Sequence, residues 1–155
     1  MRTPQLIAAL TLVAGLAGPA VAAAPAYAMA SSCVVTLYDI DLSNPREKDG
    51  VDELRFKVDG NWFPQNGHFD MSTARPDGDP ADFGFPSTIV QRQENKYFEL
   101  REVDPPVITG GQNLGEAWAF GYDCDNLGVG DIHIEDTVLS SNKYAYTVRL
   151  KLTGQ

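Results

Sequence analysis

The chain has 155 residues, 43% of them hydrophobic, and a formal net charge of −9 at pH 7. This length is typical of one domain, and the acidity argues against a protein that binds nucleic acid, because the phosphate backbone would be repelled. For the same reason, an anionic membrane surface would be approached only with bound cations in between.

The first 28 residues have the three parts of a secretory signal peptide. Arg2 supplies a positive charge, a short apolar segment follows, and a small-x-small cleavage site ends at Ala28. We therefore predict a secreted, extracellular protein in which residues 1–28 are removed and residues 29–155 form one domain. Cleavage after Ala30 and an uncleaved signal anchor are the alternatives.

Cys33 and Cys124 are the two cysteines of the chain. Exported proteins fold in an oxidising compartment, and neither cysteine has a second ligand at Cys-x-x-Cys or Cys-x-x-His spacing. We therefore predict one disulfide, with two free thiols or half of a metal site as the alternatives. It would close a loop of about 90 residues, for which the chain-entropy relation gives a stabilisation of about 4 kcal/mol.

Hydrophobic and polar side chains alternate in short runs, the pattern of half-buried strands. Turn residues separate the runs, and Asp59-Gly60 is the strongest hairpin signal. We predict an all-β protein, a single antiparallel β-sandwich of about eight short strands, with a small β-barrel as the alternative. Trp118 is predicted to face its core. The runs are 33–37, 54–58, 98–100, 118–122, 132–134 and 143–152.

Aromatic residues near the turns suggest a surface for a partner or a sugar ring. Trp62 and Phe63 follow the predicted hairpin, and Phe83 and Phe85 lie in the longest irregular segment, residues 66–86. These four residues are the candidates for binding. For Phe83 and Phe85 the alternative, that they pin the segment to the core, is the favoured interpretation.

The common catalytic motifs are missing from the sequence: it has no nucleophile elbow, zinc-protease helix, P-loop or dinucleotide fingerprint. The two histidines, His68 and His133, are interpreted as surface or strand residues. We therefore predict a noncatalytic protein. A small hydrolase that uses paired carboxylates is the alternative.

The acidic residues gather in the predicted turns, and the most suggestive group is Asp77, Asp79 and Asp82. Ca²⁺ takes six to eight oxygen ligands from flexible loops, and Asp-x-Asp spacing lets two carboxylates converge. Calcium is therefore the candidate cofactor. The alternative, which the residues themselves favour, is that these aspartates are solvated turn residues, since Asp favours turns beside Gly and Pro.

Two stretches of the chain follow one another in a recognisable order. The run 34–40 leads to an acidic loop and then to residues 50–60. This second stretch consists of an Asp-Glu pair, a hydrophobic strand and an Asp-Gly pair. Farther on, residues 99–104 are a strand and an acidic loop, and residues 113–115 are an Asn-Leu-Gly before an apolar strand. This order resembles C2-like β-sandwiches of the secreted bacterial type.

The resemblance implies a sandwich that holds Ca²⁺ between loops at one end and docks on phospholipid through it. Asp41, Asp52 and Asp104 stand at the positions that match metal contacts of the family. Residues 105–112 depart from the pattern, since the family has further aspartates there.

Together these features predict a secreted, noncatalytic β-sandwich that binds an extracellular protein, a glycan or a surface component with the assistance of calcium. A secreted inhibitor or toxin-like effector that acts through residues 66–86 is the alternative from a different class.

Overall fold

The computed structural model describes residues 28–155. The predicted signal peptide lies outside the described residues except for Ala28. Within residues 28–155, no helix is both long enough and apolar enough to cross a membrane.

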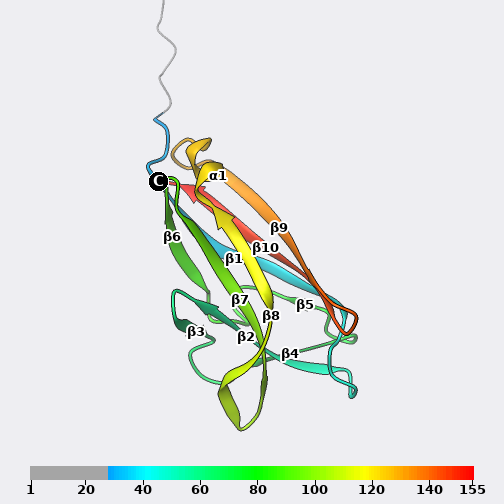
Figure 1. Cartoon of the computed structure of the whole chain (residues 1–155). Coiled ribbons are helices and arrows are strands. Elements are labelled where there is room, and N and C mark those ends of the chain that lie inside the picture. Colours follow the sequence, from blue (N-terminus) through cyan, green and yellow to red (C-terminus); the bar gives the residue numbers. More distant parts are fainter. Residues whose placement is uncertain (1–27) are drawn as a thin grey trace, which may run out of the picture.

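Ten strands form two five-stranded sheets, and every pairing of strands within them is antiparallel. The sheets pack as a sandwich (Figure 1), so the predicted fold class is confirmed, with two more strands than expected. The first sheet holds β5 (Asp77–Gly78), β1 (Ser32–Asn44), β10 (Ala145–Gly154) and β9 (Ile132–Ser140), and β6 (Ser87–Gln91) pairs with β1. The second holds β3 (Asn61–Phe63), β2 (Val51–Val58), β7 (Asn95–Asp104) and β8 (Val107–Phe120), and β4 (Phe69–Ser72) pairs with β2.

The core lies between the sheets and follows the period-two alternation of the strands. In β10, the residues from Tyr146 to Leu152 alternate strictly between buried and half-buried. Each buried leucine or valine side chain contributes about 1.5–3 kcal/mol of transfer free energy. The predicted hairpin between β2 and β3 is confirmed, since Asp59 and Gly60 both have positive φ, at 48° and 81°.

The prediction that Trp118 faces the core is wrong. Ala117 and Ala119 are the buried residues of this part of β8, and Trp118 and Phe120 lie half-buried on the outer face. Trp118 packs beside Tyr97 of β7, with ring centroids 5.0 Å apart and the ring planes tilted by 45°. Both faces of this strand carry hydrophobic side chains, so the alternation alone could not show which face is inside.

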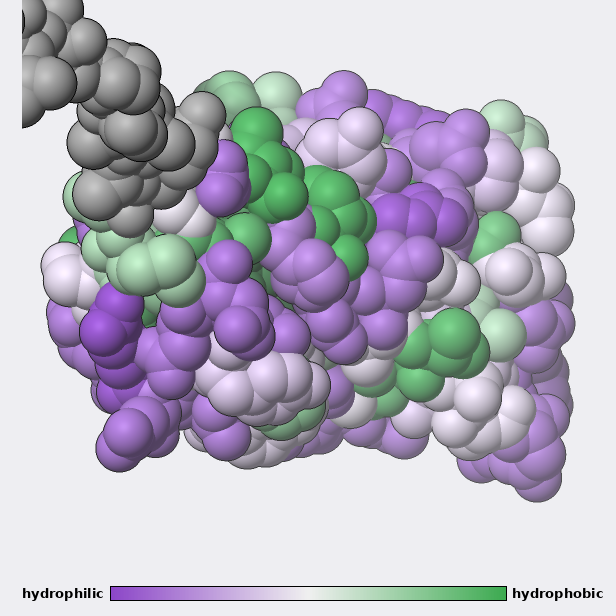
Figure 2. Space-filling view, turned by 90° about the horizontal axis from the view of Figure 1, so that it is seen from above, coloured by the Kyte–Doolittle hydropathy of each residue, from purple (hydrophilic) through white to green (hydrophobic). Residues whose placement is uncertain are grey.

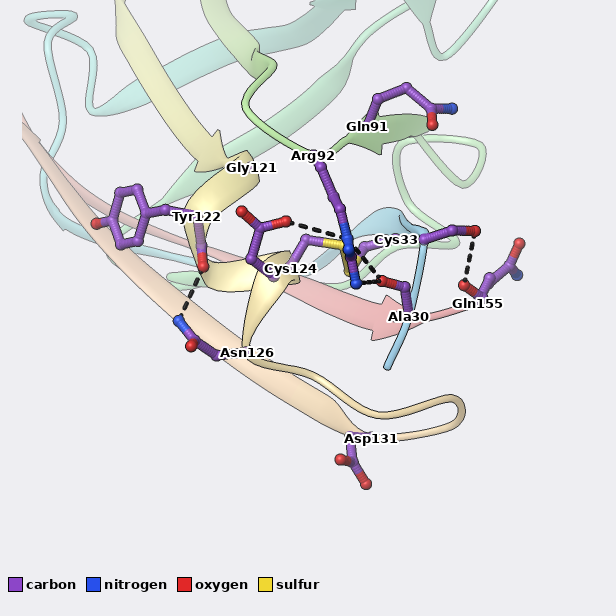
Figure 3. Close-up of a disulfide and its surroundings, with 12 residues drawn as sticks. Ala30, Cys33, Gln91, Arg92, Gly121, Tyr122, Cys124, Asn126, Asp131 and Gln155 are labelled. Atoms are coloured by element: carbon purple, nitrogen blue, oxygen red, sulfur yellow. Dashed lines mark hydrogen bonds and ion pairs between the residues drawn. A yellow bond between two sulfur atoms is a disulfide. The ribbon is translucent and has the colours of Figure 1, made fainter. Parts of the chain in front are cut away.

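The disulfide between Cys33 and Cys124 is confirmed and ties β1 to α1 (Gly121–Asp125), with the two Cα atoms 5.8 Å apart. Figure 3 shows Arg92 beside it, donating hydrogen bonds to the backbone oxygen of Ala30. Arg92 also forms an ion pair with Asp125 of α1 at 3.3 Å. The bond and this side chain together fix α1 against the start of β1.

The two ends of the sandwich differ in their side chains. The end that carries α1 and the C-terminus is at the top of Figure 1, and the β7–β8 and β9–β10 turns lie at the other end. Seen from above, the α1 end shows mainly hydrophilic residues with smaller hydrophobic patches between them (Figure 2). The opposite end holds the β1–β2 loop, with Glu47 and Asp49, and the β7–β8 turn beside Asp104, and we call it the acidic end.

Candidate functional site

The six aspartates predicted to bind metal do not form one site. Asp41 and Asp77 are register partners on β1 and β5. The carboxylate of Asp41, however, forms an ion pair with Nη1 of Arg149 at 2.7 Å, and Asp39 binds the same nitrogen at 2.7 Å. The two first-strand aspartates therefore share the single positive charge of Arg149, and both carboxylates are engaged by the protein itself.

Asp79 and Asp82 order a turn. Oδ1 of Asp79 accepts a hydrogen bond from the backbone N–H of Ala81, and Oδ2 of Asp82 accepts one from the N–H of Asp79, each at 3.1 Å. Arg75 pairs with Asp82 at 2.9 Å. These contacts agree with the alternative interpretation, in which Asp79 and Asp82 stabilise a turn rather than bind a metal.

Asp52 is buried, and both oxygens of its carboxylate are hydrogen-bonded within the protein. Its oxygens accept hydrogen bonds from the backbone N–H groups of Arg46 and Glu47, at 2.7 and 2.8 Å, and from the hydroxyl of Tyr146. Asp52 is therefore a structural residue that orders the loop between β1 and β2, rather than an open metal ligand.

The loop ordered by Asp52 brings a different set of carboxylates together at the acidic end. One oxygen each from Glu47, Glu102 and Asp104 lies within 4.8 Å of the others. We call these three residues the acidic cluster. Of the predicted metal residues, Asp104 alone belongs to it.

Arg46 joins the cluster but neutralises only part of it. Its Nη1 pairs with Glu102 at 2.6 Å and with Glu47 at 2.9 Å, and its Nη2 donates a hydrogen bond to Gln112 at 2.6 Å. Three carboxylates therefore face one guanidinium group.

Glu102 is the most unusual member of the cluster. Its side chain is only 1% exposed, and its Oε1 has no hydrogen-bond partner among the described residues. Burial raises the pKa of Glu102 to about 7; the Glu47 carboxyl raises it further, whereas Arg46 lowers it. A buried carboxylate without full compensation favours a bound proton or a bound cation.

Glu47 and Glu102 were missed in the sequence analysis. Glu102 is in phase with Phe98 and Leu100, which are buried on β7. A charged residue at a core-facing position of a strand is the signal that could have identified it. Glu47 gave no such signal, since its position depends on the fold of a loop.

The four aromatic residues predicted to bind a partner have different environments. Phe83 is fully buried, with ring centroids 5.0 Å from those of Phe56 and Phe69, so its predicted role at a binding surface is wrong and the pinning alternative holds. Phe85 is 67% exposed and remains accessible. The segment 66–86 is thus anchored to the core and contains β4 and β5.

Trp62 and Phe63 lie half-buried on β3. The guanidinium carbon of Arg55 lies 4.8 Å from the ring centroid of Trp62, which is a cation–π contact. Phe63 packs against the core. These two residues therefore support the sheet, and only part of Trp62 is left exposed to a partner.

An open depression of about 650 Å³ adjoins the acidic cluster. Its lining comes from the β1–β2 loop and the β9–β10 turn: Arg46, Glu47, Lys48, Asp49 and Lys143. It carries charges of both signs, which suits a polar ligand better than an apolar one.

No protein-family model and no curated protein matches the sequence. Among solved structures, the chain is similar to extended synaptotagmin 2, in a structure of two of its C2 domains, with 11% identity and a TM-score of 0.48. The similarity covers 99% of this chain and 48% of that one, so this chain spans about half its length. The sandwich is established by the two sheets themselves, and the C2-like assignment stays a prediction.

Proposed function

We propose that the chain is a secreted, noncatalytic binding module, and that Ca²⁺ at the acidic cluster assists its binding. The observation that carries the proposal is Oε1 of the buried Glu102, which lacks a partner among the described residues and lies beside the carboxylates of Glu47 and Asp104. Carboxylate oxygens are the ligands that Ca²⁺ prefers, and extracellular calcium is plentiful enough to fill weak sites.

The charges of the cluster agree with a divalent cation. Arg46 offsets one of three carboxylates, so two negative charges remain when all three are ionised. A cation at Oε1 of Glu102 would supply the interaction that this atom lacks. It would also hold Glu47, and with it the β1–β2 loop, close to β7.

The neighbouring depression gives the cation a role in binding. It shares Glu47 with the cluster, so a cation that fixes Glu47 also fixes part of its wall. The expected partner is a polar extracellular protein, glycan or surface component. The predicted signal peptide and the disulfide support export.

The test is thermal unfolding of the purified, oxidised protein in millimolar CaCl₂ and in EDTA. A cation that binds only the folded state raises the melting temperature. The informative variant is Asp104→Asn, because this exposed residue can lose its charge without leaving a buried group unpaired. Asp77→Asn is the matched control, since Asp77 is also an exposed aspartate at the end of a strand but lies outside the cluster.

We expect calcium to raise the melting temperature of the wild-type protein and of Asp77→Asn, and to have a smaller effect on Asp104→Asn. Equal melting in calcium and in EDTA would overturn the calcium site. An equal rise of the melting temperature with calcium in both variants would show that calcium binds elsewhere than at the acidic cluster.

A further inference from the structure

A second group of metal-binding side chains lies at the other end of the sandwich. Asp123 of α1 and His133 and Glu135 of β9 each place one ligand atom within 4.8 Å of the other two. Figure 1 shows α1 beside the start of β9, at the end opposite to the acidic cluster. Unlike that cluster, this group includes an imidazole.

The strand register turns both β9 side chains toward α1. His133 pairs with Leu152 and Glu135 pairs with Leu150, and both leucines are buried core residues of β10. Paired residues of neighbouring strands share one face of a sheet. His133 and Glu135 therefore occupy core-facing positions of an edge strand, where the end of β8 and α1 close the sandwich.

The distances suit a small divalent ion. Nε2 of His133 lies 3.3 Å from Oε2 of Glu135, a hydrogen-bonded pair in which a metal ion would take the place of the proton. Zinc binds imidazole nitrogen and carboxylate oxygen at about 2.0–2.1 Å, which places tetrahedral ligands about 3.3 Å apart. Two of the three donors thus already have the spacing of one edge of a zinc tetrahedron.

The third donor has an unused oxygen. Oδ2 of Asp123 is buried and accepts no hydrogen bond within the part of the chain that the structure describes. Among the same residues, neither Asp123 nor Glu135 forms an ion pair with a lysine or an arginine. The basic group that these two carboxylates share is the imidazole of His133. This distinguishes the group from the acidic cluster, where Arg46 compensates part of the charge.

The position of Asp123 is fixed by its neighbours in sequence. Cys124 is bonded to Cys33, and Nδ2 of Asn126 donates a hydrogen bond to the backbone oxygen of Tyr122 at 2.9 Å (Figure 3). A ligand held by a braced helix and two ligands on a strand need little rearrangement on binding, which lowers the entropic cost.

We infer that Asp123, His133 and Glu135 form a binding site for a divalent transition metal of the Zn²⁺ type. One imidazole and two carboxylates suit borderline metals such as zinc better than calcium, which prefers oxygen ligands alone. The side chains of His133 and Glu135 are 40% and 28% exposed, so a fourth position stays open to water or to a group of a partner.

The test is calorimetric titration of the oxidised protein with ZnCl₂ in millimolar CaCl₂, which keeps the acidic cluster supplied with calcium. We expect one Zn²⁺ to bind per chain. His133→Ala and Asp123→Asn should weaken binding at least about tenfold, since even residues that only support a metal ligand contribute about that much.

His68→Ala is the matched control. His68 also pairs with an acid two residues away, Asp70, at 3.0 Å, but the two belong to no group of three such donors in residues 28–155. This variant should bind zinc as the wild-type protein does. An equal loss in His68→Ala and His133→Ala would mean that zinc binds any surface histidine, and would overturn the inference.

Inward-facing charges on an edge strand also discourage pairing with a second chain. If that were the whole role of this group, His133→Ala would promote association of the protein while zinc binding was absent or unchanged, which would also overturn the inference. If zinc does not bind while calcium still raises the melting temperature, the zinc inference is overturned and the calcium site proposed at the acidic cluster stands.

Discussion

The hydroxyl of Tyr146 on β10 donates a hydrogen bond to Oδ2 of Asp52 on β2, and this contact joins the two sheets at the acidic end. Both residues are buried. The same carboxylate accepts the backbone N–H groups of Arg46 and Glu47. The Asp52 side chain thus connects the packing of the two sheets to the loop that carries Arg46 and Glu47 at the acidic cluster.

We expect Tyr146→Phe to lower the free energy of unfolding by about 1.5–3 kcal/mol, the range for a hydrogen bond to a charged group. Urea denaturation measures this change. Tyr144→Phe is the control, since Tyr144 donates to a neutral acceptor, the backbone oxygen of Leu114, at 2.9 Å. Its loss should cost about 0.5–1.5 kcal/mol. Equal costs would show that the backbone donors alone satisfy Asp52.

The β-sandwich could be predicted from the sequence because its strands follow a simple period. The alternation from Tyr146 to Leu152 predicts both a strand and its buried face. Trp118 shows the limit of this reasoning, because β8 has apolar side chains on both faces and only the opposite sheet decides which face is covered.

The acidic cluster was less predictable, because it depends on contacts between residues that are far apart in the chain. Asp52 stood in an acidic segment, as a calcium ligand would, but Tyr146 and the folded loop occupy its oxygens. Glu102 meets Arg46, which is 56 residues away. Only the two cysteines allowed a distant contact to be predicted, because just one pairing was possible.

The raised pKa of Glu102 predicts that stability depends on pH. The ordinary pKa of 4.5 rises to about 7 in the folded protein, chiefly through burial. The folded state therefore binds more protons than the unfolded state between these values, and the free energy of unfolding falls as the pH rises from 4.5 to about 7. The steepest slope from one group is about 1.4 kcal/mol per pH unit.

Glu102→Gln should flatten this pH dependence, because glutamine cannot ionise. Urea denaturation in EDTA over this pH range measures the slope without a competing cation. Glu116→Gln makes the same chemical change on β8, outside the acidic cluster, and should keep the slope of the wild-type protein. If the free energy of unfolding of Glu102→Gln still falls with pH at the wild-type slope, another titrating group is responsible for it.

Phe83 and Phe85 provide a test of how the segment 66–86 is held. Phe83 is fully buried, whereas Phe85 is 67% exposed. We expect Phe83→Ala to cost about 3–5 kcal/mol, as for other core phenylalanines, and Phe85→Ala to stay within about 0.5 kcal/mol. Thermal or urea unfolding compares the two. A stable Phe83→Ala variant would mean that the segment is anchored elsewhere.

The Cys33–Cys124 bond should stabilise the fold and also hold α1 in place. It links residues 91 positions apart, and replacement of both cysteines by alanine is expected to cost about 2–5 kcal/mol. Because Cys124 adjoins Asp123, the same change should weaken zinc binding even at temperatures where the double variant stays folded. Calorimetric titration of the folded variant measures this. Zinc affinity equal to that of the oxidised wild-type protein would show that Arg92 and the backbone contacts of α1 position Asp123 without the disulfide.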